Sequence, residues 1–215
     1  MKKKTIALFG GAFNPPHVGH SAVVRALDAL DFIDEIWLMP SANRWDKAIG
    51  VSGPDRLRMI DLMIDDMHLD AAKPVRGFDH EVRKPNLSTT YETKTELEKL
   101  YPYHEFHFVF GSDVVPNIAA TWVNGKEFFE AANFIFIERP GHPKLDRASL
   151  PPHSIAISLP DDIVRRADVS STIVRAAASD RTAIGRHVSP SVAEFIEVNR
   201  FYSASLAIKR ERAVK

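Results

Sequence analysis

Two histidines follow a glycine-rich turn near the N-terminus, and their spacing indicates phosphate chemistry. The segment Gly10-Gly11-Ala12-Phe13-Asn14-Pro15-Pro16-His17-Val18-Gly19-His20 comes directly after an apolar run at residues 5–9. His17 and His20 are three residues apart, so at a helix start they share one face. Glycine lets the backbone approach an anion, and a helix N-terminus offers free N–H groups and the positive end of the helix dipole. We therefore expect a phosphate site at a strand-to-helix junction, with both imidazoles as hydrogen-bond donors.

A second candidate anion site lies near the other end of the chain, at Ser170-Ser171-Thr172-Ile173-Val174-Arg175. Hydroxyl groups at a helix start cap free N–H groups or bind phosphate, and an arginine grips two phosphate oxygens at once. The alternative is an ordinary helix cap followed by a solvated arginine. Neither segment fits the G-x-G-x-x-G or G-x-x-x-x-G-K-[ST] pattern, so a different kind of nucleotide site is indicated.

The elements that must position these residues alternate between strands and helices. The pattern predicts strands at residues 5–9, 35–39, 75–78, 105–110, 134–137 and 154–159. Between and after them it predicts helices at residues 18–30, from 54, at 90–100, 126–132, 171–178 and 190–199, with a capping box at residues 89–92. Such alternation is typical of an α/β fold, here a Rossmann-like open, mainly parallel sheet with helices on both faces. Ligands of such sheets bind beyond the carboxyl ends of the strands.

Composition sets further limits. The 215 residues contain 45% hydrophobic and 26% charged residues, with 28 basic and 28 acidic side chains and no cysteine. We expect one domain over residues 1–215, with a short C-terminal helical portion at about 170–202 and a frayed tail. The absence of cysteine excludes disulfides, thiolate chemistry and zinc bound by cysteine. A net charge of zero does not favour binding to nucleic acid or a membrane, and no apolar run is long enough for a membrane span, so the expected location is cytoplasmic. Homo-oligomer formation is left open.

The two motifs, in this order, resemble the signatures H-x-G-H and I-S-S-T-x-x-R of the nucleotidylyltransferase superfamily. The resemblance implies transfer of a nucleotidyl group from ATP or CTP to a phosphorylated acceptor. It implies that His17 and His20 contact the nucleotide phosphates and stabilise the transition state. Ser171 and Thr172 would cap the helix and bind phosphate, and Arg175 would clamp the β/γ end of the triphosphate.

The middle of the chain is similar to the bacterial nicotinate-nucleotide adenylyltransferase family. The similar stretches are residues 56–59 (R-L-x-M), 88–93 (S-Y-T-x-D-T), 111–113 (G-x-D), 121–122 (T-W), 139–141 (R-P-G) and the closing segment 188–202. This resemblance implies that nicotinate mononucleotide and ATP are the substrates and that deamido-NAD and pyrophosphate are the products. It also implies Mg²⁺ carried on the ATP phosphates, with no metal site formed by the protein.

The same resemblance assigns roles to individual residues. The catalytic residues would be His17, His20 and Arg175. The ATP-binding residues would be Gly10, Gly11, Phe13, His17, His20, Gly111, Asp113, Ser171, Thr172 and Arg175. The acceptor would meet Arg44, Lys47, Thr90 and Trp122. Thr90 lies at a helix start whose N–H groups suit a nicotinate carboxylate, and Trp122 offers a flat face for the pyridine ring. Asp113 could instead be a helix cap, and Trp122 a core residue.

Two departures from the family pattern leave alternatives open. The loop after the second strand reads Asn43-Arg44-Trp45-Asp46-Lys47 where the family has P-P-H-K, so either Arg44 or Lys47 could approach a phosphate. Thr89 stands where the family has tyrosine, so the preference for nicotinate mononucleotide (the acid) over nicotinamide mononucleotide (the amide) is left open. The rival hypotheses are an adenylyltransferase for nicotinamide mononucleotide or another phosphorylated acceptor, a non-catalytic nucleotide-binding module, and a fragment of a class I aminoacyl-tRNA synthetase.

Overall fold

The computed structural model describes residues 2–42, 50–69, 73–84, 87–138, 145–159, 169–178 and 180–202. The strands are β1 (Lys4–Gly11), β2 (Glu35–Pro40), β3 (Val75–Gly77), β4 (His104–Gly111), β5 (Asn133–Glu138) and β6 (Ser154–Ser158). The α-helices are α1 (Val18–Asp28), α2 (Gly53–Asp66), α3 (Thr90–Leu100), α4 (Val115–Thr121), α5 (Gly125–Ala131), α7 (Ser171–Ala177), α8 (Arg181–Ile184) and α9 (Pro190–Val198). Two 3-10 helices, η1 (Ser112–Val114) and η2 (Arg147–Ser149), complete the described elements.

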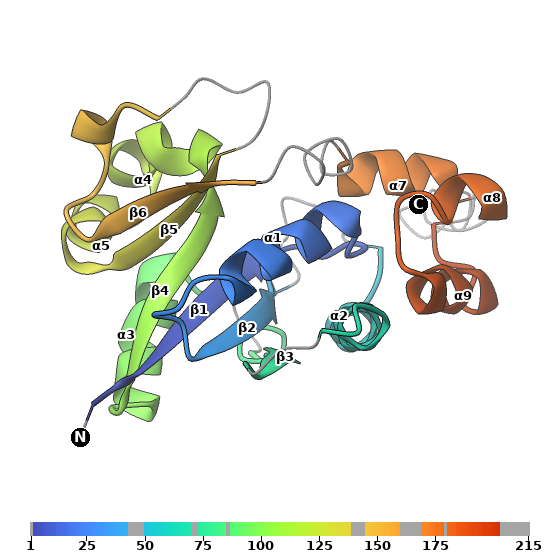
Figure 1. Cartoon of the computed structure of the whole chain (residues 1–215), viewed down its shortest axis with the longest axis horizontal. Coiled ribbons are helices and arrows are strands. Elements are labelled where there is room, and N and C mark those ends of the chain that lie inside the picture. Colours follow the sequence, from blue (N-terminus) through green and yellow to red (C-terminus); the bar gives the residue numbers. More distant parts are fainter. Residues whose placement is uncertain are drawn as a thin grey trace, which may run out of the picture.

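All six described strands belong to one sheet with the order β3-β2-β1-β4-β5-β6, and every pairing in it is parallel. The chain first winds from β1 outward to β3 and then returns to place β4 on the other side of β1 (Figure 1). The strand order therefore reverses between β1 and β4. In an open parallel sheet, a ligand crevice forms at such a point, beyond the carboxyl ends of the two strands. The expected fold class is confirmed.

Alternation along the strands gives the sheet two buried faces, which different helices cover. Ala7 and Phe9 of β1 pack with apolar residues of α1, α2 and α9 on one face. Ile6 and Leu8 point to the other face, where α3, α4 and α5 cover a core rich in phenylalanine. Successive residues of a strand point to opposite faces, so a continuous apolar strand such as β1 is buried on both sides. This arrangement fixes the carboxyl ends of β1 and β4 in place.

The sequence pattern located the six strands and the longer helices to within a few residues. It missed two short helices, α4 and α8. Helix α4 has only seven residues with a proline in its first turn, and α8 has four. Four residues are too few to show the helical period of apolar residues. Helix α4 is as long as α5 and α7, which the sequence did predict, and it was missed because its proline was not recognised as a first-turn residue. The tail predicted to fray lies within residues 203–215, outside the described residues.

The C-terminal helices are anchored to α2 through a carboxylate. Asp66, at the end of α2, accepts hydrogen bonds from the backbone N–H of Ser191 (2.8 Å) and from its hydroxyl (2.7 Å). Since Ser191 lies in the first turn of α9, the carboxylate also faces the positive end of that helix. Burial alone would raise the pKa of Asp66, but the hydrogen bonds from serine outweigh it and the pKa lies below the ordinary value of 3.8.

We expect Asp66 to make folding depend on pH in the acid range. A carboxyl group whose pKa is lowered by folding stabilises the protein above its unfolded pKa, and this contribution is lost as the pH falls through the folded pKa. Asp66→Asn should cost about 1.5 kcal/mol of unfolding free energy at pH 7, because it removes a charged acceptor of two hydrogen bonds. Urea unfolding at pH 7 and at pH 3 measures this. The difference between wild type and variant should shrink at pH 3, and an equal difference at both pH values would contradict the role given to the charge.

None of the helices in the described part of the chain is long and apolar enough to cross a membrane.

Candidate active site

The first motif forms the junction between β1 and α1, as expected. Gly10 and Gly11 end β1, and His17 is the N-cap of α1. The rings of His17 and His20 lie side by side, with their centroids 3.8 Å apart. A Cβ added at Gly10 would meet no protein atom within 4 Å, so this backbone borders open space. The geometry therefore places two imidazoles and an accessible backbone at one point.

A hydrogen bond within this turn fixes the protonation of His20. The backbone N–H of His17 donates to Nδ1 of His20 at 3.0 Å. In a neutral imidazole one ring nitrogen accepts and the other carries the proton, so the proton of His20 is on Nε2. Phe13 packs against the same ring at a centroid distance of 4.7 Å and is only 1% exposed. The structure thus makes Phe13 a support for His20, while Nε2 of His20 carries the donor N–H.

Two cavities meet at the carboxyl end of β1. The first, which we call the β2-side cavity, has a volume of about 610 Å³, and the second, the α1-side cavity, about 580 Å³. Both are lined by Gly10, Gly11, Ala12 and Phe110. Their shared wall therefore consists of the ends of β1 and β4, where the strand order reverses. Two ligands bound in these cavities would meet across the glycine-rich backbone.

The α1-side cavity collects most residues of the expected ATP site. His17 and His20 line it from α1, and Gly111 and Asp113 line it from the end of β4. Asp113 is exposed and lies inside the 3-10 helix η1, whose N-cap is Gly111. The alternative that Asp113 is a helix N-cap is therefore wrong, and the residue lines the cavity. Ser170 and Ser171 line the same cavity from α7.

The second motif folds directly onto the first. The hydroxyl of Ser171 donates to the carbonyl oxygen of Pro15 at 3.0 Å, and Nη1 of Arg175 donates to that of Asn14 at 3.0 Å. Nη2 of Arg175 also donates to the hydroxyl of Thr172 at 3.0 Å. The N-cap of α7 is Ser170, whose side chain accepts the N–H of Ile173, so the expectation that Ser171 and Thr172 cap this helix is wrong. The cap falls one residue earlier, and the hydroxyl of Ser171 binds the neighbouring loop instead.

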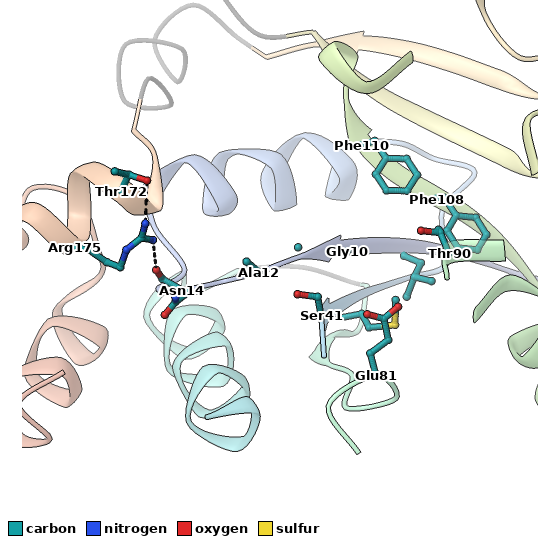
Figure 2. A pocket seen from close by; sticks show the side chains of 13 residues that line it. Gly10, Ala12, Asn14, Ser41, Glu81, Thr90, Phe108, Phe110, Thr172 and Arg175 are labelled. Carbon is teal, nitrogen blue, oxygen red and sulfur yellow. Dashed lines mark hydrogen bonds between the residues drawn. The ribbon is translucent and has the colours of Figure 1, made fainter. Parts of the chain in front are cut away.

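The β2-side cavity extends from the second motif to the start of α3. Figure 2 shows Arg175, Thr172 and Asn14 at one end and Thr90, Phe108 and Phe110 at the other. Thr90 is the first residue of α3, and the capping box between Thr89 and Glu92 is confirmed. The capping box uses the N–H of Glu92, whereas the N–H groups of Thr90 and Tyr91 have no partner within the helix itself, so this end of the cavity suits an anionic or polar group. Trp122 is not among the residues that line either cavity; it is partly buried against the phenylalanine-rich core, where its ring packs edge-on against Phe110 at 5.4 Å.

Two charged side chains that the sequence analysis did not assign to the site also belong to this region. Arg56 is fully buried, and its guanidinium donates to the carbonyl oxygens of Ala12 and Ser41, both at 2.7 Å. Burial lowers the pKa of Arg56, and these two carbonyl oxygens stabilise its positive charge.

Glu81 lines the β2-side cavity and accepts a hydrogen bond from Thr93 at 3.0 Å. Burial raises the pKa of its carboxyl group. The R-L-x-M match was the only sequence signal for Arg56, and nothing singled out Glu81.

Some expected site residues cannot be placed. Arg44, Trp45 and Lys47 lie outside the described residues. Within the described ranges, no group of three or more histidine, aspartate and glutamate side chains could hold a metal ion.

Comparison with known proteins agrees with this geometry. The model of the cytidylyltransferase-like family matches residues 8–177, a span that includes both motifs, the second half of β1 and the other five described strands. The chain belongs to the cytidylyltransferase-like family. Because the match covers most of the chain, the family accounts for the strands and for both anion-binding segments.

Individual relatives narrow the relationship within this family. A protein of Oceanobacillus iheyensis named "Probable nicotinate-nucleotide adenylyltransferase" is 31% identical over 93% of this chain and 97% of its own length. A protein of Methylacidiphilum infernorum with the same name is 32% identical over 94% and 96%. Among solved structures, a Plasmodium falciparum nicotinic acid mononucleotide adenylyltransferase complexed with NaAD superimposes with a TM-score of 0.78 at 26% identity, covering 93% of this chain and 97% of that one. Within its family, the chain falls among the nicotinate-nucleotide adenylyltransferases.

Proposed function

We propose that this protein transfers the adenylyl group of ATP to nicotinate mononucleotide, giving deamido-NAD and pyrophosphate. The observation that carries the proposal is the pair of cavities that meet at Gly10–Ala12, one lined by both histidines and the other reaching the start of α3. A dinucleotide product needs two nucleotide sites whose phosphate ends adjoin. The full-length similarity to proteins of this name, and to a structure that contains NaAD, gives the substrates.

ATP occupies the α1-side cavity in this proposal. Its phosphates lie against Gly10, Gly11 and the start of α1, where His17 and His20 donate to the α-phosphate. Asp113, beside Gly111, accepts from the adenosine. Ser171 flanks the triphosphate from α7 in this cavity, and the β/γ end of the triphosphate extends past Gly10–Ala12 to Thr172 and Arg175, which line the β2-side cavity. Arg175 uses two donors in the bonds to Asn14 and Thr172, and the rest of its five N–H groups remain for the pyrophosphate end.

The mononucleotide occupies the β2-side cavity. Its nicotinate carboxylate lies at the first turn of α3, beginning at Thr90, and its ring lies near Phe108 and Phe110, with Trp122 behind. Its phosphate points toward Gly10–Ala12. From the sequence pattern, Arg44 or Lys47 approaches that phosphate. In these proposed positions, the phosphate groups of both nucleotides meet at the backbone that the two cavities share.

The chemical step needs positioning and charge stabilisation more than proton transfer. An oxygen of the acceptor phosphate forms a bond to the α-phosphorus of ATP while the bond from that phosphorus to the β-phosphate bridging oxygen breaks. The attacking phosphate is already an anion, so no general base is required. The Nε2–H of His20 and the ring of His17 stabilise the charge that develops on the α-phosphate oxygens, and Arg175 stabilises the leaving pyrophosphate. Mg²⁺ bound to the ATP phosphates would supply further charge neutralisation.

One observation favours a second candidate acceptor, nicotinamide mononucleotide. Glu81 lies in the same cavity as Thr90. An ionised carboxylate there would repel a nicotinate carboxylate and accept a hydrogen bond from a carboxamide. Against this, burial raises the pKa of Glu81, which favours its neutral form and relieves the repulsion.

The identity of the acceptor is tested by measuring pyrophosphate release with Mg-ATP and each of the two mononucleotides separately, at equal concentration. We expect kcat/KM for the acid to exceed that for the amide by about 10²-fold, which corresponds to ~2.7 kcal/mol of transition-state discrimination. Comparable values would mean dual specificity, and a preference for the amide would contradict the proposed acceptor. Glu81→Gln should raise the ratio of kcat/KM for the acid to kcat/KM for the amide, because it removes the repulsion by the fraction of Glu81 that is ionised without changing the shape of the side chain.

A further inference from the structure

Donors from distant parts of the chain hold the loop at residues 11–15 through its oxygen atoms. The backbone oxygens of Gly11, Ala12, Asn14 and Pro15 accept from the N–H of Ser41, from Arg56, from Arg175 and from Ser171, respectively. A further bond involves a side chain: the hydroxyl of Tyr202 donates to Oδ1 of Asn14 at 2.7 Å. Because all these bonds consume acceptors, they neutralise carbonyl groups that would otherwise repel a bound phosphate.

Two consecutive prolines make this loop short of backbone donors. Pro15 and Pro16 carry no N–H group, so the loop around Asn14 has more acceptors than donors. Asn14 is only 6% exposed and lines the β2-side cavity. A buried amide oxygen without a donor would be costly, and the side chain would then be free to turn. Tyr202 supplies that donor from a position 188 residues away in the sequence.

The backbone conformation of Tyr202 indicates that the surrounding structure holds the contact between Tyr202 and Asn14 in place. Its φ angle is 63°, in the left-handed region that a bulky residue rarely adopts. Such a conformation persists only where surrounding contacts compensate for its cost. Burial raises the pKa of the Tyr202 hydroxyl, so the group stays protonated and remains a donor at all ordinary pH values. The chain thus accepts local strain just after α9 to bring one hydroxyl group to Asn14.

We infer that Tyr202 is a positioning residue of the active site: by holding the Asn14 side chain it fixes the loop at residues 11–15, on which both nucleotide cavities depend. Tyr202 itself touches no reacting atom. The turn that follows α9 therefore serves nucleotide binding through Tyr202, while α9 itself packs against α2. The effect on kcat/KM rests on the proposed function. The effect on ATP binding does not, because it is measured without the acceptor.

The test is calorimetric titration of ATP into Tyr202→Phe at 15 °C, with Tyr103→Phe as the matched control, since Tyr103 is 65% exposed. We expect the Kd for ATP to rise about tenfold in Tyr202→Phe, which corresponds to ~1.4 kcal/mol, the scale of one buried hydrogen bond. Tyr103→Phe should bind ATP like the wild type. The kcat/KM of Tyr202→Phe for ATP should fall by a similar factor.

A double-mutant cycle separates positioning from general stability. Asn14→Asp keeps an oxygen that accepts from Tyr202, whereas Asn14→Leu removes it. Tyr202→Phe should therefore weaken ATP binding in the Asn14 and Asn14→Asp backgrounds and have no further effect in Asn14→Leu. A lowered Tm with an unchanged Kd at 15 °C, or an equal effect in all three backgrounds, would overturn the inference. If the wild type binds ATP but forms no dinucleotide, the proposed function fails while the binding arm still decides the role of Tyr202.

Discussion

Replacing His20 by alanine is expected to lower kcat by about 10²–10³-fold, the usual loss when one donor to a developing negative charge is removed. The structure gives the reason. His20 accepts the N–H of His17 through Nδ1, which leaves the proton on Nε2 as the group that meets the α-phosphate. His17 lies beside it, with the ring centroids 3.8 Å apart, so both rings act at one place. Steady-state pyrophosphate release at saturating ATP and acceptor measures the effect.

A matched pair of variants separates the two nitrogen atoms of His20. In His20→Asn, the amide oxygen takes the place of Nδ1, so the bond from His17 N–H can be kept while the catalytic donor is lost. In His20→Gln, the amide nitrogen reaches the place of Nε2, so a donor is kept. We expect His20→Asn to be nearly as slow as His20→Ala and His20→Gln to recover part of kcat. An asparagine variant as active as the wild type would show that the donor at Nε2 has no part in the reaction.

Replacing Arg175 by alanine is expected to lower kcat/KM for ATP by about 10²–10³-fold, because it removes a guanidinium that stabilises the leaving pyrophosphate. Lysine at this position should restore only part of the loss, since an ammonium group cannot bind two oxygens in one plane. The variant kinetics are measured with ATP varied and the acceptor saturating.

Arg175 also holds the carbonyl of Asn14, so its effect on the loop must be separated from its effect on phosphate. Ser171→Ala is the control, because it removes a neighbouring bond to the same loop, at Pro15, without removing a charge. We expect Ser171→Ala to cost about tenfold or less. If Arg175→Ala cost no more than Ser171→Ala, the charge of Arg175 would have no catalytic role.

Local features of the site were accessible from the sequence. His17 and His20 were predicted to share a face because helical spacing alone sets their separation, and the structure confirms it. The capping box at Thr89 and Glu92 is likewise a contact within one turn. The parallel sheet followed from the alternation of apolar runs, which depends only on the period of each element.

The contacts that organise the loop at residues 11–15 could not be predicted in this way. Arg56 and Tyr202 reach that loop across 44 and 188 residues of sequence, and no periodic pattern records such a pairing. Their polar groups also run against the simple expectation that arginine and tyrosine tips face water. The division of the site into two cavities has the same origin, because it depends on how the ends of β1 and β4 are placed by the whole sheet.

Transfer of an isotopic label from ATP to the acceptor tests the proposed reaction itself. The protein is incubated with nicotinate mononucleotide and Mg-ATP labelled at either the α- or the γ-phosphorus, and the products are separated by chromatography. The label at the α-phosphorus should appear in deamido-NAD, and the label at the γ-phosphorus should appear only in pyrophosphate, with one pyrophosphate released per dinucleotide formed. Appearance of the γ-label on the mononucleotide, or release of pyrophosphate with the α-label remaining in AMP, would contradict adenylyl transfer.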